Sequence, residues 1–343
     1  MSVVPTVDDT RDSDAIAPDT LVLRPRSSHS ADGRSPEPEF LALGTLVERY
    51  ELVERLGAGG MGVVYKAHDP QLSRHVALKF LRHDSTDLYR LARAEEYRER
   101  LLREAQALAK LSHPNVVTVF EVGEHEGSVF LAMEFIEGVP LRAWVSERKG
   151  RTREVLRALI EAGRGLAAAH RAGVLHRDFK LGNVMVSDDG RVRVFDFGLA
   201  RSADQPDPEP REEASGPVRP RSALLGSDLT QSGALLGTVG YIAPESFLAG
   251  RLDERSDQFS YAEAVFVALT GGHSHDVDSS EAYRAALLSR PRPRWPRGIS
   301  PRVRRVVERG LALNPAERYP SMDAMVDALE RSMRPPRAWV AAG

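Results

Sequence analysis

The sequence predicts an α+β fold with two lobes, a small β-rich lobe followed by a larger and mostly helical one. Between residues 50 and 138, short apolar runs rich in β-branched residues alternate with turn residues, which is typical of antiparallel strands. One long charged segment, residues 89–111, places Leu and Ala at helical spacing and predicts the main helix of this lobe. After Gly138 helical spacing dominates, so the second lobe is expected to be mostly helical.

Each lobe divides into elements at its turn residues, glycines and prolines. In the first lobe we expect strands at residues 50–57, 62–69, 74–81, 115–123 and 127–138. In the second lobe we expect helices at residues 141–148, 152–172, 256–271, 280–289, 300–313 and 321–333, with short strands at 183–187 and 191–197. A length of 343 residues, at roughly 150 per domain, is enough for two such lobes.

The ends of the chain differ from its middle. Residues 1–47 are expected to be a disordered N-terminal tail, because prolines are scattered among Asp, Ser and Arg without a sustained apolar period. We expect the first lobe at residues 48–136, the second at 137–332 and a C-terminal stub at 333–343. Within the second lobe, a proline-rich run at about residues 203–233 excludes helix and central strand and is too long for a passive connection.

Composition excludes several classes of function. Hydrophobic residues make up 42% of the chain and charged residues 28%, close to ordinary usage in soluble proteins. A net charge of −2 provides no basic field for nucleic acid or an anionic membrane. The absence of cysteine excludes a disulfide scaffold, cysteine-ligated zinc, an iron–sulfur cluster and a cysteine nucleophile. Neither a secretory signal nor a run of about 18 apolar residues is visible, so we expect a cytoplasmic location.

The string GAGGMG, residues 57–62, has the G-x-G-x-x-G spacing of a phosphate-binding loop. A dinucleotide-binding loop of the Rossmann type uses the same spacing, but there the third glycine opens a helix. Here Val63, Val64 and Tyr65 follow, which favour a strand. The sequence therefore favours a glycine hairpin that covers phosphates, with a plain structural hairpin as the alternative.

Lys79 ends an apolar strand, Val-Ala-Leu-Lys, and its ammonium group needs an anion. The chain has only five lysines among 47 basic residues, so a retained lysine indicates a place where arginine would not serve. Glu104 on the predicted helix is the best protein partner, because Glu95, Glu96 and Glu99 stand in a run of alternating charges typical of a solvated face.

The most informative string is HRDFKLGN, residues 176–183, followed thirteen residues later by Asp196–Phe197–Gly198. With the glycine loop, Lys79 and the later GTVGYIAPE, these motifs resemble the eukaryotic-like Ser/Thr protein kinases, and most of all the bacterial receptor-type ones. The resemblance covers about residues 48–332 and implies the two-lobed protein kinase fold. It also implies ATP and Mg²⁺ or Mn²⁺ as cofactors, and serine or threonine hydroxyls of proteins as acceptors.

The resemblance assigns roles that suit phosphoryl transfer, in which negative charge develops on the γ-phosphoryl oxygens. Asp178 would orient the acceptor hydroxyl and take its proton, with Lys180 beside the γ-phosphate. Lys79, steadied by Glu104, would hold the α- and β-phosphates, and Asn183 and Asp196 would ligate the metal. The ATP-binding residues implied are Leu56, Gly57, Ala58, Gly59, Gly60, Met61, Gly62, Val63, Val64, Ala77, Lys79, Met133, Glu134, Ile136 and Met185.

Residues 196–245 correspond to the activation segment of these kinases. Arg177 precedes the catalytic aspartate, in the position of an arginine that receives a phosphate on this segment, and we expect Thr230 and Ser232 to carry it. Self-association for autophosphorylation in trans is expected with it. The structural residues implied are Arg177, Thr238 as a bridge between Asp178 and Lys180, Asp257 as an anchor of the catalytic loop, and Glu245 paired with Arg318.

Several alternatives compete with a kinase. A pseudokinase usually lacks Lys79, Asp178, Asn183 or Asp196, and a small-molecule phosphotransferase should lack the GTVGYIAPE segment. Nucleic-acid binding would rest only on the arginine- and proline-rich residues 289–298, which favour a stiff, solvated connector. Metal binding by His273, His275 and Asp276 is disfavoured, because histidines in such a loop are usually solvated. Contact with a membrane is expected only if the chain is a fragment whose stub leads into a membrane helix.

Overall fold

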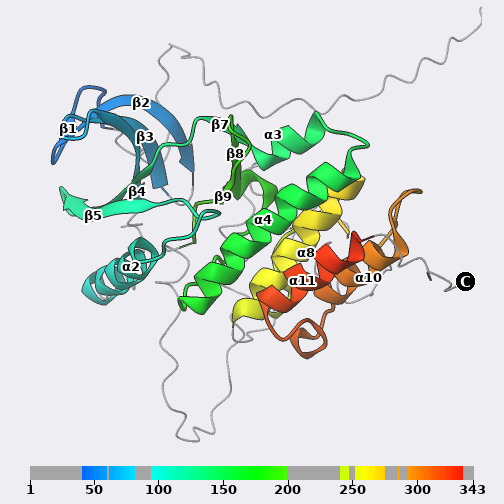
Figure 1. Ribbon diagram of the computed structural model, residues 1–343. Coiled ribbons are helices and arrows are strands. Elements are labelled where there is room, and N and C mark those ends of the chain that lie inside the picture. Colours follow the sequence, from blue (N-terminus) through cyan, green and yellow to red (C-terminus); the bar gives the residue numbers. More distant parts are fainter. Residues whose placement is uncertain are drawn as a thin grey trace, which may run out of the picture. The chain divides into compact units, whose positions relative to one another are not determined.

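The computed structural model describes residues 41–59, 62–81, 94–198, 240–246, 252–274, 285 and 293–334. The first lobe is a six-stranded antiparallel sheet with the strand order β1-β2-β3-β4-β6-β5 (Figure 1). One long helix, α2, lies beside β5. The bounds are β1 Leu46–Val47, β2 Tyr50–Gly59, β3 Gly62–Asp69, β4 Arg74–Leu81, α2 Ala94–Ala109, β5 Val119–His125 and β6 Ser128–Glu134.

The first lobe begins earlier than the sequence predicts. Residues 41–47 were expected to belong to the disordered tail, but Leu46 and Val47 form β1 and pair with β2. Val47 is fully buried, and Leu41 packs against the same apolar cluster. Gly44 and Thr45 exchange backbone hydrogen bonds with Leu52 at 2.7 and 3.0 Å. A strand of two residues is too short to show a periodicity in the sequence. It is held by pairing with β2, which the local sequence of residues 41–47 does not reveal. Residues 1–40 of the predicted tail lie outside the described residues.

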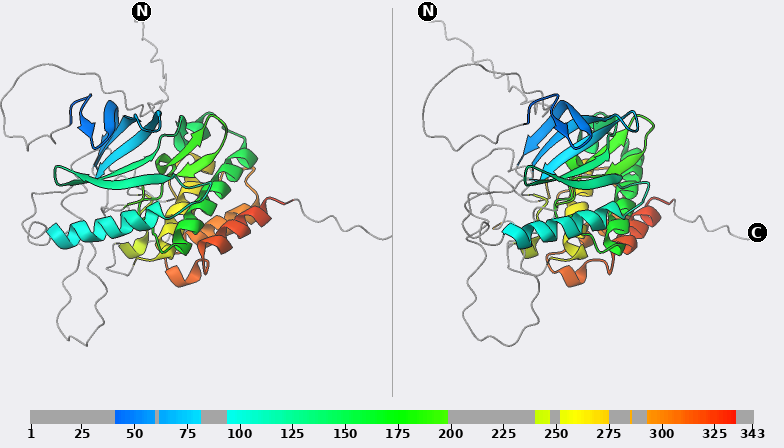
Figure 2. Two further views of the ribbon diagram at one scale, coloured as in Figure 1. Left: turned by 60° about the vertical axis from the view of Figure 1, so that its left-hand side comes forward. Right: turned by 90° about the vertical axis from the view of Figure 1, so that its left-hand side faces the viewer.

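The second lobe is mostly helical, with a small sheet of order β7-β8-β9 at its junction with the first (Figure 1). Helix α4 runs beside α8 and α11, as both views of Figure 2 also show. The predicted helix at 280–289 lies outside the described residues apart from position 285. The bounds are β7 Gly138–Pro140, α3 Leu141–Ser146, α4 Thr152–Arg171, β8 Val184–Ser187, β9 Val192–Val194, α8 Glu254–Thr270, α10 Pro301–Gly310 and α11 Met322–Ser332, with 3-10 turns at Leu181–Asn183, Pro244–Ser246 and Pro315–Glu317.

Helix ends in the second lobe follow local chemistry. Asp253, Ser300 and Ser321 cap the N-termini of α8, α10 and α11 by accepting hydrogen bonds from backbone N–H groups two or three residues ahead. Gly271 ends α8 in the left-handed conformation with φ of 84°, which only glycine adopts without cost. Among the described residues, no helix combines the length and the apolar character needed to cross a bilayer.

The alternation of side chains along the strands builds two cores. On β6, Phe130 and Ala132 belong to a cluster on one face of the sheet, whereas Val129, Leu131 and Met133 join the main core. On β4, Ala77 and Leu81 face the main core. Because side chains on a strand alternate between faces, Lys79 lies on the same face as these two residues. The period of the strand therefore directs Lys79 towards the junction of the two lobes.

Candidate active site

The glycine loop forms a hairpin between β2 and β3. Gly57 pairs with Val64, Ala58 with Val63, and Gly59 with Gly62. A strand therefore follows the third glycine, as predicted, whereas a Rossmann loop would open a helix there. Gly62 has φ of 134°, and a Cβ there would collide with the carbonyl oxygen of Phe80. Gly60 and Met61, at the tip, lie outside the described residues.

The expected adenine-site residues surround this hairpin. Ala77 on β4 pairs with Met133 on β6, and both are buried, while Val64 on β3 pairs with Lys79. The segment after β6 continues through Glu134 and Ile136, which are half-buried. Leu56 on β2 and Met185 on β8 are also half-buried. Strand pairing thus brings together Ala77 and Met133, which are 56 positions apart in the sequence.

Asp178 lies at the centre of the catalytic loop and is 5% exposed. The side-chain amide of Asn183 donates to the carbonyl oxygen of Asp178 at 2.8 Å and to its Oδ2 at 3.1 Å. Lys180 Nζ lies 2.9 Å from the same Oδ2. The loop therefore holds the carboxylate from two sides. This arrangement leaves the amide oxygen of Asn183 as the atom that suits a cation.

The segment Asp196–Phe197–Gly198 is held against the catalytic loop. The backbone N–H of Gly198 donates to the carbonyl oxygen of His176 at 2.8 Å, and the His176 ring packs on Phe197 with centroids 4.7 Å apart. His176 Nε2 donates to the carbonyl oxygen of Phe195 at 3.1 Å. Burial lowers the pKa of His176, so its ring is neutral at pH 7. A Cβ at position 198 would lie 2.9 Å from the His176 carbonyl oxygen, which favours glycine there.

Two functional positions adopt a left-handed backbone that side chains rarely accept. Arg177 has φ of 60° and Asp196 has φ of 62°. Each such residue costs of order 1–3 kcal/mol, and such residues cluster at active sites where the surroundings over-determine them. In this conformation the Asp196 carboxylate forms an ion pair with Lys79.

The expected ion pair between Lys79 and Glu104 is not formed in this structure. Lys79 Nζ contacts Asp196 instead, and Glu104 pairs with Arg177, whose Nη1 lies 3.3 and 3.5 Å from the two carboxylate oxygens. Burial raises the pKa of Glu104, and Arg177 offsets only part of this effect. The sequence motifs single out Lys79 and Glu104. Whether Glu104 contacts Lys79 or Arg177 depends on the position of α2, which the local sequence does not encode.

Asp257 at the start of α8 holds the backbone of the catalytic loop. Its two oxygens accept hydrogen bonds from the backbone N–H groups of His176 at 2.7 Å and Arg177 at 2.8 Å. His170 on α4 donates to it at 2.8 Å. Burial alone would raise the pKa of Asp257, but the hydrogen bond from His170 and the nearby histidines outweigh it and hold the pKa below its ordinary value.

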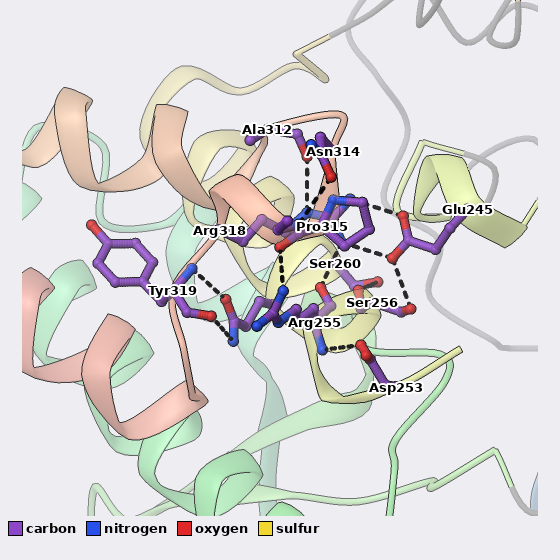
Figure 3. Close-up of polar contacts among 12 residues, drawn as sticks. Glu245, Asp253, Arg255, Ser256, Ser260, Ala312, Asn314, Pro315, Arg318 and Tyr319 are labelled. Atoms are coloured by element: carbon purple, nitrogen blue, oxygen red, sulfur yellow. Dashed lines mark hydrogen bonds and ion pairs between the residues drawn. The ribbon is translucent and has the colours of Figure 1, made fainter. Parts of the chain in front are cut away.

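Arg318 and Glu245 form a bidentate ion pair at 2.7 and 2.8 Å (Figure 3). Arg318 is 2% exposed and also donates to the carbonyl oxygens of Ala312 and Arg255 at 2.8 and 2.7 Å. Ser256 donates to Glu245 at 2.8 Å. This group of residues, which we call the Arg318 anchor, ties the Pro244–Ser246 turn to α8 and to the turn before α11.

Some expected residues fall outside the described part of the chain. They are Thr230, Ser232 and Thr238 in the activation segment, its proline-rich run, and the histidine and aspartate at positions 275 and 276. His273 contacts Glu263 at 3.0 Å. Within the described residues, no group of three His, Cys, Asp or Glu side chains is placed to hold a metal.

Two further buried polar residues hold segments of the chain together and were not expected from the sequence. Glu263 is fully buried on α8 and accepts from the backbone N–H of Ser274 at 2.8 Å. Asn115 donates to the carbonyl oxygen of Val192 at 2.9 Å and so joins the segment before β5 to β9. Glu263 gave a signal, because it is a charge inside the apolar run Tyr-Ala-Glu-Ala-Val-Phe. Asn115 gave none beyond its place in a His-Pro-Asn turn.

Comparisons with known proteins agree with this geometry. Residues 50–329 match the family model described as the protein kinase domain. The chain is 35% identical over 304 residues to the serine/threonine-protein kinase PknA of Mycobacterium tuberculosis, and 35% identical over 289 residues to PknL of the same species. These matches cover 85% and 83% of this chain but only 64% and 66% of the two relatives.

Solved structures give the same result. The kinase domain of Mycobacterium tuberculosis PknI superposes with a TM-score of 0.59 at 26% identity and covers 86% of this chain and 99% of that domain. The structure titled PpkA-294 apo form, at 23% identity and a TM-score of 0.61, shares the fold. The predicted two-lobed kinase fold is confirmed, and the chain belongs to the protein kinase family.

Proposed function

We propose that this chain is a serine/threonine protein kinase that transfers the γ-phosphoryl group of ATP to hydroxyl groups of proteins. The observation that carries the proposal is the convergence of Lys79, Asp178, Asn183 and Asp196 at the junction of the lobes, from three separate segments: β4, the catalytic loop and the residues after β9. The names of the relatives PknA and PknL support the serine/threonine class. The lysine two residues after Asp178 supports it as well, because tyrosine kinases that resemble this fold have an arginine and alanines in that loop.

Asp178 has the surroundings of a group that positions a hydroxyl. It is buried and held by Asn183 and Lys180, so its carboxylate is oriented before a substrate arrives. As the hydroxyl oxygen bonds to the γ-phosphorus, the bond from that phosphorus to the β–γ bridging oxygen breaks and ADP leaves. The hydroxyl proton passes to Asp178 late in the step. Lys180, beside the same carboxylate, would stabilise the charge that develops on the γ-phosphoryl oxygens.

The residues present fit Mg²⁺, the cation that kinases of this family generally use. Asp196 provides a carboxylate and Asn183 an amide oxygen, both hard ligands of the kind that Mg²⁺ prefers. When bound, the metal neutralises charge on the phosphates. Asp196 contacts Lys79 here, so loading with nucleotide and metal requires Lys79 to turn from this carboxylate towards the phosphates.

The proposal includes control by the activation segment. Arg177 directly precedes Asp178 and lies 3.3 Å from Glu104, and a guanidinium group at this place suits a phosphate on Thr230 or Ser232. Autophosphorylation in trans, by association of two copies, would place it there. A cytoplasmic location stays a prediction from the sequence.

The decisive experiment measures transfer of radiolabelled phosphate from ATP with Mg²⁺ by the purified chain. We expect Asp178→Asn to lower the rate by about 10²- to 10⁴-fold. Phosphoamino-acid analysis should find phosphoserine and phosphothreonine only. A variant with Asp188→Asn, a nearby exposed aspartate, is the matched control and should keep full activity. A folded Asp178→Asn variant with the rate of the wild type would refute the kinase proposal.

A further inference from the structure

Three polar side chains on one face of α8 hold the end of the activation segment. Ser256, Ser260 and Glu263 follow one another at i, i+4 and i+7, which is the spacing of residues on one side of a helix. Ser256 donates to Glu245 Oε1 at 2.8 Å (Figure 3). Ser260 donates to the carbonyl oxygen of Tyr241 at 2.7 Å. Glu263, one turn further on, reaches the same segment through the loop that follows α8.

Glu263 is a fully buried carboxylate whose hydrogen-bond donors come from that loop. His273 Nδ1 lies 3.0 Å from its Oε1, and the backbone N–H of Ser274 donates to the same oxygen at 2.8 Å. The Ser274 hydroxyl donates to Oε2. Because an ionised carboxylate only accepts, His273 Nδ1 carries the proton in this contact. A buried carboxylate needs such donors, so Glu263 holds both loop residues in place.

The ring of His273 lies against Gly240 and Tyr241. Its centroid is 5.0 Å from that of the Tyr241 ring, and the two planes meet edge to face at 83°. A Cβ at position 240 would collide with the His273 ring, so a glycine is needed for this approach. The His273 side chain is 17% exposed. It therefore connects the buried carboxylate of Glu263 to the backbone and the ring of two residues in the activation segment.

Helix α8 also holds the catalytic loop. Asp257 accepts hydrogen bonds from two backbone N–H groups of that loop, at 2.7 and 2.8 Å. Ser260, which holds Tyr241, follows three residues later and so lies within one turn of the same helix. Residues 240–246, which we call the 240–246 segment, are thus fixed to the same helix as the loop of Asp178, to which an acceptor protein must bring its hydroxyl. The residues assigned to ATP lie on other elements.

We propose that His273 is a positioning residue for the acceptor protein: held by Glu263, it sets the conformation of Gly240 and Tyr241, against which the substrate chain lies. This inference rests on the proposed kinase function. It implies that loss of the hydrogen bond between His273 and Glu263 impairs the use of a peptide and leaves the use of ATP intact. His273→Phe tests this, because it keeps an aromatic ring beside Tyr241 but cannot donate to Glu263.

The kinetic experiment uses the full chain and a serine or threonine peptide, chosen as the one phosphorylated fastest among peptides randomised around one fixed hydroxyl residue. We expect His273→Phe to lower kcat/KM for this peptide by about tenfold. The KM for ATP and the hydrolysis of ATP without peptide should stay within about twofold of the wild type. Glu263→Gln keeps an oxygen that accepts from His273, so its kcat/KM should stay within about threefold.

His125→Phe is the matched control. His125 is also half-buried and meets an aromatic ring edge-on, with its centroid 6.4 Å from that of Phe80, but it lies in the first lobe. This variant should keep the kinetic constants of the wild type for both substrates.

Amide hydrogen exchange tests the positioning without relying on activity. We expect His273→Phe to speed exchange in the 240–246 segment and to leave the catalytic loop, residues 176–183, as in the wild type. Melting temperatures check that every variant is folded.

An unchanged kcat/KM for the peptide in His273→Phe, or unchanged exchange in the 240–246 segment, would overturn the proposal. So would an equal fall in peptide phosphorylation and in ATP hydrolysis, because the ring would then support the lobe as a whole. A wild type that phosphorylates no peptide would refute the proposed kinase function, whereas an active wild type with an equally active His273→Phe variant would refute this inference alone.

Discussion

Two arginine–glutamate pairs in this protein have the same chemistry and opposite surroundings. Arg318 and Glu245 meet in a bidentate contact at 2.7 and 2.8 Å, and two carbonyl oxygens and Ser256 complete the network (Figure 3). Arg177 and Glu104 meet at 3.3 and 3.5 Å, through one guanidinium nitrogen. The first pair lies within one lobe, whereas the second joins the catalytic loop to α2.

The pKa values of the two glutamates differ in direction for the same reason. Burial alone would raise the pKa of Glu245, but the hydrogen bonds from Arg318 outweigh it and lower the pKa. Burial also raises the pKa of Glu104, and there the longer contact with Arg177 is too weak to reverse it. The comparison teaches that a motif identifies a pair, while distance and burial decide whether the pair is a fixed support or one that can exchange partners.

The largest expected effect tests the fixed pair. Replacing Arg318 by Met should lower the free energy of unfolding by about 3–5 kcal/mol, because Glu245 would be left as a buried charge without its partner. Denaturant titration followed by circular dichroism measures this. The double variant Arg318→Met/Glu245→Leu should recover part of the loss, since it removes the stranded charge as well. A loss below about 1 kcal/mol for Arg318→Met would show that the network contributes no more than a surface pair.

The next effect concerns the exchangeable pair and the activation segment. We expect Thr230→Ala/Ser232→Ala to lower kinase activity by about tenfold or more, because a phosphate there would form charge-assisted hydrogen bonds with Arg177. The measurement is initial rate after preincubation with ATP and Mg²⁺, with mass spectrometry of the loop. Ser215→Ala/Ser222→Ala is the matched control and should behave as the wild type. Full activity of the first double variant would contradict the assignment.

A smaller effect is expected for Arg177 on stability. Arg177→Met should change the free energy of unfolding by less than about 1 kcal/mol, because its partner Glu104 is partly exposed and its pair is long. Measured beside Arg318→Met under the same conditions, it sharpens the contrast between the pairs. If Arg177→Met lowers the free energy of unfolding as much as Arg318→Met, the two pairs contribute equally to stability and the contrast between them is wrong.

The smallest effect is a difference in acid sensitivity with opposite signs. The pKa of Glu245 is lower in the folded protein, so the stability it contributes is present above about pH 4.5 and lost as pH falls through the folded pKa. The melting temperature of Glu245→Gln should therefore approach that of the wild type as pH falls from about 6 to 3.

Glu104 has a raised pKa when folded, so its contribution is present below about pH 4.5 and lost as pH rises through the folded pKa. The melting temperature of Glu104→Gln should therefore rise relative to that of the wild type as pH rises from about 4 to 6. Scanning calorimetry across this range checks both variants. Shifts of the same sign in the two variants would contradict the pKa directions.

Much of the fold could be predicted, because strands and helices with strong periodicity indicate their own type. The strands 62–69 and 74–81 match their predicted bounds, and α4 differs by one residue at its C-terminus. The start of the first lobe was wrong by several residues, since β1 is two residues long and has no pattern of its own. Local signals also failed for Asn115, whose side chain bridges two segments 77 positions apart.

The sequence by itself determined the family, and it predicted which residues carry the chemistry. Spacing within a loop, such as that from His176 to Asn183, survives any arrangement of the lobes, because covalent geometry limits how far neighbouring residues separate. Only the tertiary structure decided that Lys79 contacts Asp196 and that Glu104 contacts Arg177. These contacts join elements distant in the chain, and their choice depends on how whole helices and sheets pack, which no local pattern encodes.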